Sequence, residues 1–208
     1  MVNLVIDGQR VEAEEGWTVL EAARYYGIDD IPTLCHVDGL TPYSACRLCV
    51  VEMKRGKKSR LVASCSCPVE EGVEVLTQSQ RVTRARKVII ELMLATTPNS
   101  RTVQCLASAY GVDRVRFHGE DRRCLHCGLC VRVCEEQMLG GAIGFARRGI
   151  DREVTMPFHK KSEACRGCGA CLYICPAVEL PCTGVLEPGE LCNRCVDELR
   201  IDAFPSGD

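Results

Sequence analysis

Alternation of apolar and polar residues predicts a hairpin and a helix at the start of the chain. Residues 2–6 (VNLVI) and 10–13 (RVEA) flank an Asp-Gly dipeptide at 7–8, which is favoured in two-residue hairpin turns. Thr18 and Glu21 then have the spacing of a capping box, so a helix is expected to begin there. A hairpin followed by a helix is typical of a small sheet-and-helix domain of the β-grasp kind.

A longer helix is predicted over residues 80–95, where apolar residues recur near the helical period and Pro98 follows. The apolar positions are Val82, Ala85, Val88, Ile89, Leu92 and Ala95. This helix is expected to join the parts of the chain before and after it.

Most of the chemistry in the chain resides in its cysteines, and eight of them form two matched runs. Cys124, Cys127, Cys130 and Cys134 follow the spacing C-x2-C-x2-C-x3-C, and Cys165, Cys168, Cys171 and Cys175 repeat it before Pro176. In two-cluster ferredoxins, the first three cysteines of a run ligate one [4Fe–4S] cluster and the fourth ligates the other. The fourth cysteine of each run is expected to begin a helix. A pair of zinc knuckles is the alternative.

This rule assigns the eight thiolates to two clusters. The first cluster takes Cys124, Cys127, Cys130 and Cys175, and the second takes Cys165, Cys168, Cys171 and Cys134. Apolar neighbours are expected to keep water from both clusters; they are Leu129, Val131, Val133, Ile143, Leu172 and Ile174.

A further set of cysteines lies earlier in the chain, at Cys35, Cys46, Cys49 and Cys65. Their spacing is C-x10-C-x2-C-x15-C, so a loop would supply three thiolates and the end of the predicted sheet the fourth. Four thiolates can hold a [2Fe–2S] cluster with two on each iron. The first gap is longer than the four residues of plant-type ferredoxins, and a zinc site is therefore the alternative.

Composition favours metal thiolates over disulfides. The chain has 17 cysteines in 208 residues, an odd number in tight groups, and its first residues lack the basic and apolar regions of a secretory signal. A cytoplasmic protein with reduced thiols is expected. The formal charge of −2 is evenly distributed and indicates no nucleic-acid partner, and no apolar run is long enough for a transmembrane segment.

The motifs IPTLC-x10-CRLCVVE, VASCSCPVEEG and VLTQSQRVTRARKVIIELML resemble the N-terminal domain shared by two groups of proteins. One group is the 75-kDa-type iron–sulfur subunit of complex I. The other comprises diaphorase-type and hydrogenase subunits of NAD(P)-linked hydrogenases and formate dehydrogenases. RCLHCGLCVRVCEEQ and CRGCGACLYICP resemble the two-cubane module of the same family. The resemblance implies that Cys35, Cys46, Cys49 and Cys65 bind a [2Fe–2S] cluster and that Cys67 is not a ligand.

The resemblance also implies an α+β fold with distinct parts. These are a β-grasp [2Fe–2S] ferredoxin-like domain at 1–78, a helical connector at 79–112, a two-[4Fe–4S] bacterial-ferredoxin-like domain at 113–181 and a cysteine-containing tail at 182–208. Relatives carry a third site, H-x3-C-x2-C-x5-C, near the connector, but here its histidine and cysteines are absent and Arg101 stands at the last position. Cys105 follows within the helix pattern and is expected to be a buried core thiol.

The tail holds Cys182, Cys192 and Cys195, one ligand short of a metal site. A further iron–sulfur cluster, zinc, a redox-active CxxC or free thiols are the open alternatives. The missing ligand could come from Cys67, Cys105, a histidine such as His159 or another subunit.

No GxGxxG motif follows a predicted strand, and the chain has no P-loop or set of acid–base residues, so no catalytic residue is assigned. The resemblance implies an electron-transfer subunit between a flavoprotein that oxidises or forms NAD(P)H and a hydrogenase, formate dehydrogenase or transhydrogenase subunit. Several such complexes carry out electron bifurcation, which the sequence leaves open. A free-standing polyferredoxin and an iron–sulfur redox-sensing regulator are the alternative functions.

Overall fold

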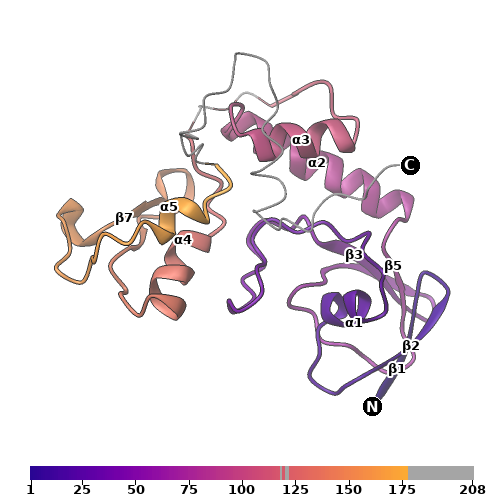
Figure 1. The fold of residues 1–208 in the computed structure, drawn as a ribbon. Coiled ribbons are helices and arrows are strands. Elements are labelled where there is room, and N and C mark those ends of the chain that lie inside the picture. The colour runs from indigo at the N-terminus through magenta and orange to yellow at the C-terminus, as the bar shows by residue number, and fades with distance from the viewer. Residues whose placement is uncertain (118, 120–121, 178–208) are drawn as a thin grey trace, which may run out of the picture.

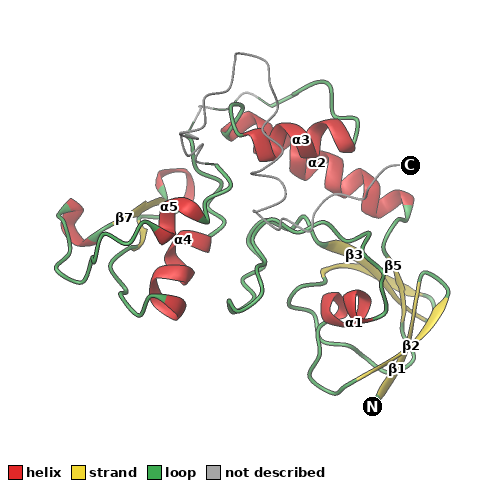
Figure 2. Ribbon diagram, in the orientation of Figure 1, coloured by secondary structure: helices red, strands yellow, loops and turns green. Residues whose placement is uncertain are grey.

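The computed structural model describes residues 1–117, 119 and 122–177 of the chain, and they form three groups of elements (Figure 1). A mixed sheet with one helix comes first, a pair of helices follows, and a small domain of short helices and a two-stranded sheet comes last (Figure 2). Within the described residues, no helix is both long and apolar enough to cross a membrane.

The N-terminal sheet has five strands in the order β2-β1-β5-β3-β4. Its strands are β1 (Val2–Ile6), β2 (Gln9–Ala13), β3 (Val50–Arg55), β4 (Lys58–Ala63) and β5 (Glu74–Leu76). Strand β5 pairs parallel with β1 and antiparallel with β3, and so it joins two antiparallel hairpins into one mixed sheet. This arrangement, with one helix packed on the sheet, confirms the expected β-grasp domain.

The predicted hairpin and capping box are both confirmed. Asp7 and Gly8 have φ angles of 46° and 84°, as a turn with two left-handed residues requires. Helix α1 (Val19–Tyr25) begins after Thr18, whose hydroxyl accepts the Glu21 amide at 3.2 Å. The Glu21 carboxylate accepts the Thr18 amide in return at 2.7 Å. Gly27 follows the end of the helix in the left-handed backbone conformation that glycine favours, with a φ of 69°.

A first hydrophobic core lies between the sheet and α1. Ile6, Val51 and Val75 from three adjacent strands are fully buried, as are Val19 and Leu20 from the helix. The alternation of the strand residues places these side chains on the face that α1 covers.

The connector consists of α2 (Gln80–Thr96) and α3 (Arg101–Ala109), which pack against each other (Figure 1). The predicted helix over 80–95 is confirmed to within one residue. The prediction that Cys105 is a buried thiol was wrong, because Cys105 is exposed. Val103, Leu106 and Ala107 form the buried face of α3, and Cys105 lies on the exposed side of the same helix.

A second hydrophobic core joins parts of the chain that are far apart in sequence. It contains Leu34 and Leu48 from the loops around the first cysteines, Ile90 from α2, Leu106 from α3 and Leu129 from the C-terminal domain. Cys35, Cys46 and Cys127 belong to the same core. The N-terminal and C-terminal cysteine sites are therefore packed against one shared set of apolar side chains.

The C-terminal domain is built from short elements. In chain order they are α4 (Leu129–Arg132), the π-helical turn η1 (Val133–Gln137), β6 (Gly144–Ala146), the 3₁₀ turn η2 (Gly149–Asp151), β7 (Glu153–Thr155), the 3₁₀ turn η3 (Pro157–His159) and α5 (Ala170–Tyr173). The two helices follow Gly128 and Gly169, which have φ angles of 76° and 77°. The expectation that the fourth cysteine of each run begins a helix was wrong, because Cys134 lies in η1 and Cys175 follows α5.

Candidate metal centres

The four cysteines of the N-terminal domain converge from two loops at one end of the sheet. Cys35, Cys46 and Cys49 lie in the long loop between α1 and β3, and Cys65 follows β4. All four are buried, with exposed fractions between 0% and 9%. The structure therefore brings together the four residues that the spacing predicted as ligands.

Hydrogen bonds divide these four cysteines into two pairs. The Cys46 thiol bonds to Cys35 and lowers the pKa of Cys35 to about 6, and the Cys49 thiol likewise lowers the pKa of Cys65 to about 6. In return, the pKa values of Cys46 and Cys49 are raised, first by those same bonds and then by burial. Two adjacent thiol pairs are the donor set that a [2Fe–2S] cluster requires, with two thiolates for each iron.

Further donors surround the sulfur atoms. The Cys46 amide donates to the Cys35 sulfur at 3.5 Å, and the Ser44 hydroxyl lies 3.5 Å from the Cys65 sulfur. Ser44 has a φ of 57°, so the loop takes a left-handed conformation where its hydroxyl approaches the site. Hydrogen bonds to ligand sulfur are one way in which a protein sets the potential of an iron–sulfur cluster.

The first run of C-terminal cysteines lies partly in the shared core. Cys127 is 6% exposed, and burial raises the pKa of its thiol to about 12 and that of Cys130 to about 11. Cys127 and Cys130 both interact electrostatically with Cys175, and Cys130 also with Cys124. The structure therefore brings Cys175, from the second run, to the cysteines of the first run. That is the arrangement on which the predicted exchange of fourth ligands depends.

The second run is more open to solvent. Cys168 is exposed, whereas Cys165, Cys171 and Cys175 are partly exposed. Cys134 lies near this run, because a side chain added at Gly140 would meet both the Cys134 sulfur and the Ala164 carbonyl at 3.5 Å. The predicted apolar cover is uneven: Leu129 is 2% exposed, but Leu172 is 51% exposed, so that part of the prediction was wrong. Helix α5 has no buried residue, so Leu172 stays open to solvent with the rest of the helix.

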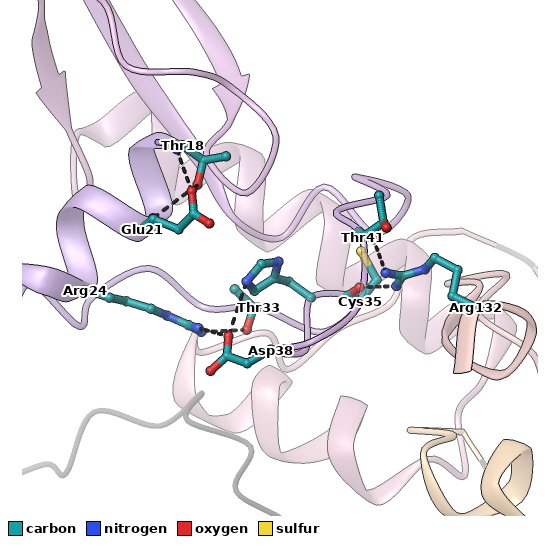
Figure 3. Close-up of polar contacts among 9 residues, drawn as sticks. Thr18, Glu21, Arg24, Thr33, Cys35, Asp38, Thr41 and Arg132 are labelled. Atoms are coloured by element: carbon teal, nitrogen blue, oxygen red, sulfur yellow. Dashed lines mark hydrogen bonds and ion pairs between the residues drawn. The ribbon is translucent and has the colours of Figure 1, made fainter. Parts of the chain in front are cut away.

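Several side chains that the sequence analysis missed connect the two domains. Arg132 of α4 donates to the main-chain carbonyls of Cys35 and Thr41 (Figure 3). The Glu136 carboxylate accepts the Thr41 amide at 2.6 Å. Arg132 could have been noticed in the sequence, because it is a charged residue between Val131 and Val133 in an otherwise apolar segment.

Tyr43 also belongs to this contact. Its ring is stacked on Phe145, with centroids 6.3 Å apart, and its hydroxyl accepts a hydrogen bond from Arg152 at 2.8 Å. A side chain added at Gly128 would lie 3.0 Å from the Tyr43 ring. The loop that carries Cys46 is thus packed directly on the turn between Cys127 and Cys130.

Besides Cys105, four further cysteines belong to none of the three predicted ligand sets discussed above: Cys67 and the tail residues Cys182, Cys192 and Cys195. Cys67 is half-buried, and burial raises the pKa of its thiol. Cys182, Cys192 and Cys195 lie outside the described residues. In the part of the chain that is described, no three histidine, cysteine or carboxylate side chains are arranged to hold a single metal ion.

Two family models match the chain, one for each cysteine-bearing domain. Residues 1–80 match the 2Fe-2S iron–sulfur cluster binding domain, and residues 123–178 match the 4Fe-4S dicluster domain. The two matched segments contain all twelve cysteines that the spacing assigned to clusters.

Whole-chain comparisons find relatives in NADH- and NADPH-linked oxidoreductases. The chain is 33% identical to the NADH-ubiquinone oxidoreductase 75 kDa subunit of Reclinomonas americana, over 74% of this chain and 26% of that protein. It is 34% identical to the NADPH-Fe(3+) oxidoreductase subunit alpha of Geobacter sulfurreducens, over 72% of this chain and 20% of that protein. The chain thus spans about a quarter or less of the length of these relatives.

A solved structure has the same fold over most of its length. A chain of the NAD+-reducing [NiFe]-hydrogenase in the H2-reduced state superposes with a TM-score of 0.66 and 29% identity, covering 74% of each chain. The chain therefore contains a 2Fe-2S iron–sulfur cluster binding domain and a 4Fe-4S dicluster domain, and it is homologous to the 75-kDa-type subunits of NADH-ubiquinone oxidoreductases.

Proposed function

We propose that this chain relays electrons through one [2Fe–2S] and two [4Fe–4S] clusters. The proposed ligands are Cys35, Cys46, Cys49 and Cys65 for the [2Fe–2S] cluster, Cys124, Cys127, Cys130 and Cys175 for one cubane, and Cys165, Cys168, Cys171 and Cys134 for the other. When bound, each cluster takes up and releases single electrons. The protein supplies ligands, insulation and orientation, and no acid–base residue is assigned.

The observation that carries this proposal is the shared core between the two cluster-binding domains. Cys35 and Cys127 contribute to the same buried cluster of side chains, and they interact electrostatically. Electron transfer weakens steeply with distance, so a relay requires neighbouring sites to be packed together without intervening solvent. Leu34 and Leu129 fill this core and support that requirement.

The partners of the proposed relay follow from its relatives. The similar proteins are named as parts of NADH-ubiquinone oxidoreductase, NADPH-Fe(3+) oxidoreductase and an NAD+-reducing hydrogenase. We infer that a flavoprotein subunit exchanges electrons with NAD(P)H at one end of the chain. A second catalytic subunit, such as a hydrogenase, formate dehydrogenase or transhydrogenase, would stand at the other end, in the cytoplasm.

The metal content of anaerobically purified protein tests the cluster assignment. Three clusters require about ten irons per chain, two in a [2Fe–2S] and eight in cubanes. About fourteen irons would place another cubane at the tail cysteines. Stoichiometric zinc in place of iron would refute the relay at the site that holds it.

A single substitution tests the first ligand set. Cys46→Ala should remove the [2Fe–2S] EPR signal and leave both cubane signals, because Cys46 contributes only to the N-terminal site. Cys67→Ala is the matched control, since it removes a nearby sulfur atom that is not a proposed ligand. Loss of the cubane signals in Cys46→Ala, or of the [2Fe–2S] signal in the control, would contradict the assignment.

Co-purification separates the relay from a free-standing polyferredoxin. A relay subunit should purify from its native source with a flavin-containing subunit and a second oxidoreductase subunit. A monomeric protein that exchanges electrons with several unrelated enzymes would support the polyferredoxin instead.

A further inference from the structure

Two arginine side chains are buried next to the N-terminal cysteine site. Arg86 of α2 is 0% exposed, and Arg132 of α4 is 7% exposed. A guanidinium stays protonated in proteins, so both side chains carry a charge into the interior. A buried charge is costly unless an opposite charge and hydrogen bonds compensate it.

The hydrogen bonds of Arg86 go only to neutral acceptors. Its Nη2 donates to the Val50 carbonyl at 2.9 Å, and its Nη1 donates to the Asp30 carbonyl at 3.3 Å and the Tyr110 hydroxyl at 3.4 Å. Its buried Nε has no hydrogen-bond partner. These contacts satisfy three of the five N–H groups, and none of the three acceptors carries a charge.

Arg132 has the same kind of environment. It donates to the carbonyls of Cys35 and Thr41 (Figure 3). Its guanidinium carbon lies 5.6 Å from the centre of the Tyr43 ring. Its Nε is also buried without a partner. Among residues 1–117, 119 and 122–177, neither arginine forms an ion pair with a carboxylate.

Each guanidinium is bonded to the backbone at a different half of the four-cysteine site. Arg132 is bonded to Cys35, which is paired with Cys46. Arg86 is bonded to Val50, the residue after Cys49, and it interacts electrostatically with the Cys49 sulfur. The anions that face the two charges are therefore the cysteine sulfur atoms and, for Arg86, the Asp30 carboxylate as well.

We propose that Arg86 and Arg132 are the buried counter-charges of the [2Fe–2S] cluster and that they raise its reduction potential. The inference rests on the proposed ligation by the four N-terminal cysteines. A cluster held by four thiolates is anionic, and one-electron reduction adds one more negative charge to it. Fixed positive charges in a low-dielectric interior stabilise the reduced form more than the oxidised form.

The test is an EPR-monitored redox titration of the full chain, with dithionite as reductant in the presence of mediator dyes. Arg86→Gln and Arg132→Gln remove the charge but keep a hydrogen-bond donor. Arg84→Gln is the control, because it removes the same charge from an exposed position on the same helix. Arg86→Lys and Arg132→Lys keep the positive charge but replace the planar guanidinium group with an ammonium group.

Each glutamine variant should lower the equilibrium constant for reducing the [2Fe–2S] cluster at least tenfold, which is about 59 mV for one electron. The Arg84→Gln control and both lysine variants should stay within about threefold of the unsubstituted protein, equivalent to about 28 mV. Glutamine variants that titrate like the control would overturn the inference. A tenfold shift in the lysine variants would also overturn it, because geometry rather than charge would then be decisive.

If a glutamine variant does not bind the [2Fe–2S] cluster, the reduction potential of the corresponding lysine variant still tests the inference. The failure of the cluster assignment is distinguishable as well. If the unsubstituted protein shows no [2Fe–2S] signal, the proposed function fails, whereas a signal of unchanged potential in the glutamine variants rejects only the role of the arginines.

Discussion

Leu106→Ala should destabilise the protein where its three parts meet. Leu106 is 1% exposed in the second core, which also contains Ile90 of α2, Leu48 of the cysteine loop and Leu129 of the C-terminal domain. Truncating a buried leucine removes its transfer free energy and leaves a cavity, at a cost of about 2–5 kcal/mol. The side chains around Leu106 come from several elements, so we expect them to move little into the cavity. We therefore expect the free energy of unfolding to fall by about 3 kcal/mol.

That loss corresponds to a lower melting temperature. For a chain of this size, 1 kcal/mol shifts the midpoint by about 2–4 °C, so about 3 kcal/mol predicts a shift of about 6–12 °C. The measurement is an anaerobic thermal scan of the cluster-loaded protein, followed by far-UV circular dichroism and by visible absorbance of the clusters. All variants are compared at one scan rate, because cluster loss makes unfolding irreversible.

Cys105→Ala is the matched control, since Cys105 precedes Leu106 on the same helix but is exposed. Its effect should be within about 0.5 kcal/mol, the usual range for surface substitutions. If Leu106→Ala melts within about 2 °C of Cys105→Ala, then α3 is not packed into this core and the reasoning is refuted.

Three further substitutions, one of them with a matched control, test individual features. Thr18→Ala should cost about 1 kcal/mol through loss of the capping box, seen as a lower midpoint in the same thermal scan, and an unchanged midpoint would contradict the cap. Gly128→Ala should impair the first cubane and lower the iron content, because the new Cβ would lie 3.0 Å from the Tyr43 ring. Gly141→Ala has a similar φ but open space around it, so it should retain its iron. Cys175→Ala should perturb the cubane of the first run, and an EPR change confined to the cubane of the second run would reject exchanged fourth ligands.

The contact between the two domains gives the proposed relay its physical basis. Arg132 joins α4 to the loop of Cys35, and Tyr43 packs on the turn at Gly128. Both contacts involve residues next to proposed ligands. A displacement of one domain would therefore disturb both sites, and we expect the two domains to behave as one unit in electron transfer.

The turn, the helix cap and the long helix were predictable because each depends on residues that are close together in the sequence. The turn at Asp7-Gly8 and the capping box of Thr18 and Glu21 depend on residues at most three positions apart, and the structure confirms both. The helix over residues 80–95 was predicted from its apolar period for the same reason. Cys105 was misjudged because cysteine is often buried, whereas its exposure depends on which face of α3 the rest of the protein covers.

The sequence by itself determined the cysteine sets, because ligand spacing in short runs reflects the local geometry of a cluster-binding loop. It also indicated the β-grasp opening and the family resemblance. Only the tertiary structure decided that Cys127 shares a core with Cys35 and that Cys175 lies near Cys130. Likewise, only the fold places two arginines against the four-cysteine site. Such contacts join residues dozens of positions apart, and packing selects them without leaving a periodic pattern in the chain.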